Sequence, residues 1–282
     1  MKNKKLSRSN LNSSITSVLA ALLCIVIGMA VGFLVLLAIN PAHAWGDGFV
    51  RIVKGGFYDT PYGVGKELAN AAPLIMTGLS VGFAFKTGLF NIGAAGQYTL
   101  GAYGALYCAI MLKMPWYVCL IVATILGGIW GAIPGLFKAL LNINEVLACI
   151  MTNWIAANLV TWLFDISNFK NVTESTKTGY IYKTTYNGVA TAKMGLDKLF
   201  PNSQVNGGIL IAIVFAIAVY VMMSKTTFGY QLKACGSNRH AARYAGIADK
   251  RNIVISMAIA GGLSAAGASL LSLIHISEPT RQ

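Results

Sequence analysis

The side chains that could carry chemistry in this sequence are few, and most are amides set within apolar stretches. Asn91 and Gln97 lie in a glycine-rich segment, residues 89–97, which reads LFNIGAAGQ. Glu145 and Asn153 are a little over two helical turns apart, so a helix would place both near one face. All four are candidate contacts for a polar solute. No catalytic residue is indicated, because HExxH and paired-carboxylate arrangements do not occur, and GLSVG at 78–82, which has the letters of GxSxG, lies inside an apolar run.

The elements that must position these residues are membrane spans. Of 282 residues, 56% are hydrophobic and 11% are charged, against about 25% charged in an average soluble domain. Uncharged runs close to the ~20 residues that cross a bilayer recur along the chain. We therefore expect an all-α, polytopic transmembrane helical bundle of about seven spans. They are 17–39, 68–85, a less regular 87–112, 114–137, 146–164, 205–224 and one that begins at Asn252.

The third span is expected to be discontinuous. If the turn before it ends at Gly96, the helix that follows is about 16 residues long, or ~24 Å, which is short of the ~30 Å hydrocarbon core. Part of the glycine-rich segment must then lie at membrane depth, where irregular backbone survives only against protein or a polar cavity. Such spans often mark a substrate path. The alternative is that the glycines allow tight packing and both amides bond to neighbouring backbone.

The net charge of +13 is interpreted as a topology signal with lipid contact rather than as a nucleic-acid site. Lys2, Lys4, Lys5 and Arg8 place the N-terminus inside, and the basic loop 225–251 returns to that side after six crossings. The first apolar run is too long for a cleaved signal peptide.

For Glu145, the alternative to a path role is a helix-start carboxylate favoured by the helix dipole. The five cysteines lack CxxC spacing, so no metal site is indicated.

Loop 225–251 carries the third informative pattern. Asn238 can cap a short helix and Gly246 can end it in the left-handed conformation. Between them, three alanines make a small apolar face, and Arg239 and Arg243 can face the opposite surface. Such a helix suits docking into a partner, although an ordinary solvated loop helix is the alternative. The candidate docking residues are Gly236, Asn238, Arg239, Arg243, Tyr244 and Gly246.

Three motifs in this order resemble the permease family of ribose, nucleoside and branched-chain amino acid ABC importers. They are LFNIGAAGQ, NEVLACIMTNWIA at 144–156, and FGYQLKACGSNRHAARYAGI at 228–247. The first two are more similar to the nucleoside and general simple-sugar branch, and the resemblance covers roughly residues 68–270. Ala95 stands where relatives commonly carry Glu, so no carboxylate role is carried over to it.

The resemblance implies a permease subunit of an ATP-driven importer in the bacterial inner membrane. It would form the translocation path for nucleosides or simple sugars. Its partners would be an ATP-binding subunit gripping loop 225–251, an extracellular or periplasmic substrate-binding protein, and a second permease subunit, identical or paralogous. ATP and Mg²⁺ would be used by the ATP-binding subunit, since this chain has no GxxxxGK[ST] motif and needs no cofactor itself.

Two other classes remain open at this point. An ion-coupled secondary transporter would need intramembrane ionisable groups, of which the spans offer little beyond Glu145. A membrane-embedded enzyme would need a catalytic arrangement, and none in the sequence supports one.

The expected organisation is a cytoplasmic tail at 1–16 and a permease domain at 17–270, with external loops 40–67 and 165–206. The second external loop either meets a binding protein or is merely variable. Residues 271–281 resemble an in-frame translation of a transposase-type sequencing adapter. We therefore expect 271–282 to be a non-native tail that replaces further spans.

Overall fold

The computed structural model describes residues 2–57, 60–166, 190–201, 203 and 205–277, and it is helical without any strand in those ranges. This confirms the all-α prediction. Most of the predicted external loop 165–206 lies outside the described residues, as do the last five residues of the predicted non-native tail. The chain divides into two units, residues 1–63 and 64–282.

The first unit is built on α1 (Lys2–Ile39), whose segment Val18–Ile39 is long and apolar enough to cross a membrane. Pro41 begins α2 (Pro41–His43), because proline is well suited to a first helical turn. A π-helical turn η1 (Ala44–Val50), α3 (Arg51–Lys54) and a 3₁₀ turn η2 (Gly55–Phe57) follow. The Phe33 ring of α1 packs on Trp45 and Phe49, with ring centroids 5.6 and 4.9 Å apart. The start of the predicted external loop 40–67 is therefore folded.

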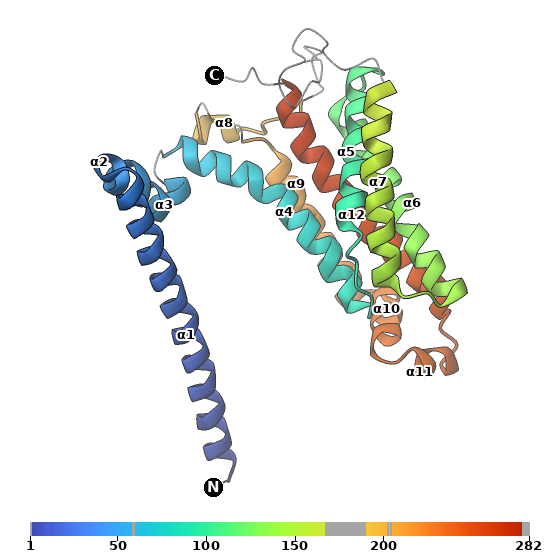
Figure 1. The fold of residues 1–282 in the computed structure, drawn as a ribbon. Helices are drawn as coiled ribbons and strands as arrows, with labels where there is room; N and C mark the ends of the chain where they lie inside the picture. Colours follow the sequence, from blue (N-terminus) through green and yellow to red (C-terminus); the bar gives the residue numbers. More distant parts are fainter. Residues whose placement is uncertain (1, 58–59, 167–189, 202, 204, 278–282) are drawn as a thin grey trace. The chain divides into compact units, whose positions relative to one another are not determined.

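The second unit contains six long helices (Figure 1). Five are long and apolar enough to cross a membrane, which with α1 gives six candidate spans in the described part of the chain. The remaining helix, α5, has 17 residues, is not among these six, and corresponds to the short helix that the sequence predicts in the third span. The long helices are α4 (Tyr62–Lys86), α5 (Ala94–Ile110), α6 (Trp116–Leu141), α7 (Glu145–Ile166), α9 (Gly208–Lys225) and α12 (Asp249–Ser277).

Three short helices complete this unit: α8 (Leu196–Leu199), α10 (Thr227–Ser237) and α11 (Arg239–Tyr244). The pair α10 and α11 lies at the end of the helical bundle where α12 begins, and α8 lies toward the opposite end (Figure 1). Loop 225–251 is thus largely helical, as the capping signals predict.

The core of the second unit is organised around α12, which is 78% buried over its apolar window, whereas α4, α6, α7 and α9 are 22–39% buried. It packs against α5 and α6 through small residues. A Cβ at Gly101 would lie 2.7 Å from the Cα of Ala265, and a Cβ at Gly131 would lie 2.5 Å from the carbonyl oxygen of Met257. Glycine is therefore needed at these crossings so that the backbones can approach closely.

Candidate functional site

The glycine-rich segment occupies the irregular connection between α4 and α5. The chain leaves helical geometry after Lys86, turns through Gly88 at a φ of +72°, and resumes a helix at Ala94. Leu89 and Asn91 are buried within this connection. The predicted discontinuity is therefore present, and protein packs around it, as irregular backbone at membrane depth requires.

Asn91 and Gln97 form a reciprocal amide pair inside the bundle. The Asn91 Nδ2 donates to Gln97 Oε1 at 2.9 Å, and the Gln97 Nε2 donates to Asn91 Oδ1 at 3.1 Å. Asn91 Nδ2 also donates to the Ser80 hydroxyl of α4 at 3.2 Å. Both side chains are only 1% exposed. Because the amides satisfy each other, they can be buried without the cost of unpaired polar groups.

Asn153 of α7 joins the same region from the side. Its Oδ1 accepts the backbone N–H of Gly96 at 2.8 Å, and its Nδ2 donates to the carbonyl of Ile92 at 2.9 Å. The first turn of a helix leaves N–H groups without intrahelical partners, and the residue before α5, Gly93, has no side chain to cap them. Asn153 therefore caps α5 from a neighbouring helix. Three of the four predicted path residues thus lie in the glycine-rich segment or bind to it.

Glu145 is placed differently. It is the first residue of α7, as the helix-dipole alternative holds, and its carboxylate lies 2.9 Å from the Lys138 Nζ of α6. Both side chains are partly exposed. Among the described residues, no hydrogen bond or ion pair joins Glu145 to Asn91, Gln97 or Asn153. The four residues therefore form two separate groups, and a path role for any of them stays a prediction.

The short helix α11 follows its capping signals. Asn238 Oδ1 accepts the N–H of Ala241 at 3.0 Å, and Gly246 ends the turn at a φ of +77°. Gly236 has a different role, because a Cβ there would lie 2.8 Å from the backbone nitrogen of Gly88. Tyr244 is 95% exposed.

Both arginines of α11 bind Asp249 at the start of α12. Arg239 Nε donates to Asp249 Oδ2 at 2.6 Å, and Arg243 Nη2 donates to the same oxygen at 2.8 Å. The hydrogen bond to Asp249 also raises the pKa of Arg243 above its ordinary value. Asp249 is not among the candidate residues named from the sequence.

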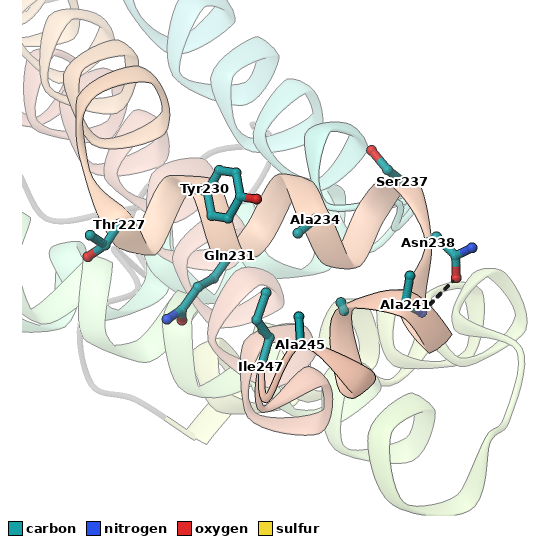
Figure 2. Close-up of a pocket in the computed structure, with 10 residues that line it drawn as sticks. Thr227, Tyr230, Gln231, Ala234, Ser237, Asn238, Ala241, Ala245 and Ile247 are labelled. Carbon is teal, nitrogen blue, oxygen red and sulfur yellow. Dashed lines mark hydrogen bonds between the residues drawn. The ribbon is translucent and has the colours of Figure 1, made fainter.

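The predicted alanine face of α11 lines a groove of about 560 Å³ between α10 and α11. Figure 2 shows Ala241 and Ala245 on one side and residues of α10, including Tyr230 and Ala234, on the other. Tyr230 is 70% exposed. The groove is lined by alanines and Ile247 together with polar side chains such as Gln231 and Ser237, and an exposed aromatic ring lies at its edge. This is a form that a protein surface inserting a side chain would fit.

Comparison with known proteins agrees with the resemblance. The family described as "Branched-chain amino acid transport system / permease component" matches residues 65–280. The chain is 34% identical to the guanosine ABC transporter permease protein NupP of Bacillus subtilis, over 89% of this chain and 70% of that protein. It is 32% identical to the nucleoside ABC transporter permease protein NupB of Lactococcus lactis, over 91% of this chain and 71% of that protein.

A glucose ABC transporter permease protein, TsgB13 of Haloferax volcanii, is 30% identical over 86% of this chain and 64% of that protein. No solved structure gives a significant match. The family match covers well over half of the chain, and six helices in the described residues can cross a membrane. The chain therefore belongs to the branched-chain amino acid transport system permease family and is an integral membrane permease of the ABC transporter class.

Proposed function

We propose that this chain is the translocating subunit of an ATP-driven importer for nucleosides, with simple sugars as the second candidate class. The observation that carries the proposal is its similarity, over about nine-tenths of its length, to permeases named for guanosine and for nucleosides. A glucose permease is similar at slightly lower identity, which supports the sugar alternative.

The groove between α10 and α11 is the proposed docking site for a separate ATP-binding subunit. Its walls include four alanines, and Tyr230 of α10 lines it with most of its surface exposed. Tyr244 is exposed on α11 but does not line the groove. Exposed aromatic side chains at the edge of a groove are frequent anchors of protein interfaces. In this account, ATP and Mg²⁺ act in the partner, and this chain converts the movement of its loop into opening and closing of the path.

The proposed path runs beside the glycine-rich segment. Asn91, Gln97 and Asn153 satisfy one another and the surrounding backbone, so their first task is to hold the shape of this irregular connection. Any contact with solute would require one of these hydrogen bonds to be exchanged for a bond to the solute. Glu145, tied to Lys138, would act at the end of α7 rather than inside this network.

Loop 225–251 and the N-terminus are placed in the bacterial cytoplasm by the positive-inside rule. An external or periplasmic binding protein would then deliver the solute to the opposite face. Exposed apolar side chains on α6 and α9, such as Ile125, Ile129 and Ile217, would face lipid or a second permease subunit.

The docking proposal is tested by co-purification of the full chain with candidate ATP-binding subunits. Tyr230→Ala, which removes the exposed tyrosine that lines the groove, should reduce the bound ATP-binding subunit at least about tenfold, as expected for loss of an interface anchor. Tyr62→Ala, which removes an exposed tyrosine at the first residue of α4, is the matched control and should bind normally. Equal binding by both variants, in preparations that elute as a single species, would exclude this groove as the docking site.

A further inference from the structure

Asp249 is the point where the short helix α11 is fastened to the long helix α12. Its carboxylate, 7% exposed, accepts from Arg239 Nε at 2.6 Å and from Arg243 Nη2 and Nε at 2.8 and 3.3 Å. The two arginines are one helical turn apart on α11. A single carboxylate therefore holds α11 at two points along its length, and we call these three residues the Asp249 clasp.

The other anchors of α11 are its packing against α10 and hydrogen bonds within its own turn. Asn238 caps its first residues, and the chain beyond it is closed by hydrogen bonds from Gly246 N–H to the Arg243 carbonyl and from Ile247 N–H to the Ala242 carbonyl. A helix of six residues is not stable by itself, because nucleation costs more than so few hydrogen bonds return. Its position relative to α12 therefore depends on bonds such as those of the clasp.

The helix that receives the clasp is the best packed of the second unit. Gly261 of α12 packs against Gly131 of α6, and Ser264 donates a hydrogen bond to the carbonyl of Ala94 at 2.8 Å. Ala94 is the first residue of α5, directly after the irregular connection. A displacement at the start of α12 can therefore reach the glycine-rich segment through contacts that leave little free space.

We propose that Asp249 is a positioning residue that makes α11 and α12 move as one body. A displacement of α11 by the ATP-binding subunit then reaches α12, and through Ser264 and Ala94 the beginning of α5. Asp249 takes no part in docking, because its carboxylate is buried beneath the two arginines. The inference rests on the proposed function, since it assumes that an ATP-binding subunit docks on the groove between α10 and α11.

The test uses the full chain reconstituted in proteoliposomes with its ATP-binding and solute-binding proteins, and it measures radiolabelled guanosine taken up per ATP hydrolysed. Asp249→Asn keeps the size of the side chain and removes its charge. It should retain the bound ATP-binding subunit and its ATP hydrolysis, while the uptake ratio falls at least about fivefold, the lower end of typical coupling between sites. Asp197→Asn, which alters an exposed carboxylate on α8, should leave the ratio unchanged.

A conservative change supplies the second variant. Asp249→Glu keeps the carboxylate that both arginines bind, so its ratio should stay within about twofold of the unaltered protein, whereas Arg243→Asp should lower the ratio at least about fivefold. An unchanged ratio in Asp249→Asn would overturn the inference. So would loss of the ATP-binding subunit in both Asp249→Asn and Asp249→Glu, since that would assign the clasp to folding or docking. Failure of the unaltered complex to assemble or to take up guanosine would instead refute the proposed function.

Discussion

Replacing Asn153 by alanine removes two hydrogen bonds that hold the irregular connection before α5. The Oδ1 of this residue accepts from Gly96 N–H at 2.8 Å, and its Nδ2 donates to the Ile92 carbonyl at 2.9 Å. Gly96 is buried, so its N–H group would be left without a partner, whereas Ile92 is partly exposed and its carbonyl can reach another donor. The loss is therefore dominated by one buried donor.

The expected magnitude follows from these two bonds. Leaving a buried donor unpaired costs about 1–3 kcal/mol. Side-chain hydrogen bonds in membrane proteins contribute about 0.6 kcal/mol on average, because the unfolded chain in the membrane also finds partners. Asn153 is itself only partly buried, which lowers the value further. We expect Asn153→Ala to reduce the free energy of unfolding by about 1–3 kcal/mol.

The assay is reversible unfolding of the detergent-solubilised chain by increasing amounts of sodium dodecyl sulfate, followed by tryptophan fluorescence. Asn158→Ala is the matched control on the same helix, because Asn158 is exposed and donates only to the Trp154 carbonyl within α7. Its effect should stay within about 0.5 kcal/mol, as for most surface changes. Equal destabilisation by the two variants would refute the assignment of Asn153 as the cap of α5.

Three further predictions concern packing and charge, each checked by the same unfolding assay. Gly96→Ala should lower the free energy of unfolding by about 1–3 kcal/mol, because the new Cβ would lie within 3.0 Å of atoms of α7. Gly78→Ala is the control: no atom of the described residues lies within 4 Å of its Cβ position, so it should be neutral or slightly stabilising. Gly236→Ala should also cost about 1–3 kcal/mol, because its Cβ would meet the backbone of the turn after α4 at 2.8 Å, and a neutral result would show that this contact is loose. Lys138→Glu should lower the free energy of unfolding by about 1 kcal/mol, because it removes a partly exposed ion pair with Glu145. Exchanging Lys138 and Glu145 should restore the stability, and no recovery would show that the 2.9 Å contact is not formed in solution.

Much of the fold could be predicted because its signals are local in the sequence. Apolar runs located the spans, and the shortness of the helix after Gly96 predicted the irregular third span. Asn238 and Gly246 behave as cap and terminator because both roles depend on a few neighbouring residues. The alanine face of α11 was predicted correctly, although it lines a groove beside α10 within the same chain.

The arrangement of the candidate site could not be predicted, because it depends on which helices pack together. Asn153 caps α5 by binding the N–H of Gly96, which lies 57 residues earlier in the sequence, and only the packing of α5 against α7 brings the two residues together. The pair formed by Asn91 and Gln97 likewise needs the turn geometry of the connection. The sequence showed Asp249 as one charge in a basic loop, and nothing in its spacing indicated that both arginines bind it.

Two pairs of glycines, each four residues apart on one helix, also show that packing partners cannot be predicted from sequence spacing. The pair Gly127 and Gly131 packs against α12, but Gly78 and Gly82, which have the same spacing, meet no other atom within 4 Å among the described residues. Spacing identifies a helix face that can be approached closely. It does not identify what approaches it.

The central claim is that this chain moves its solute with energy supplied by a separate ATP-binding subunit. The most direct measurement is uptake of radiolabelled guanosine into proteoliposomes that contain the chain and its binding protein, with and without the ATP-binding subunits and ATP on the side of loop 225–251. The account predicts uptake only when both are present, and no response to an imposed proton or sodium gradient. Uptake driven by such a gradient in the absence of the ATP-binding subunits would contradict it.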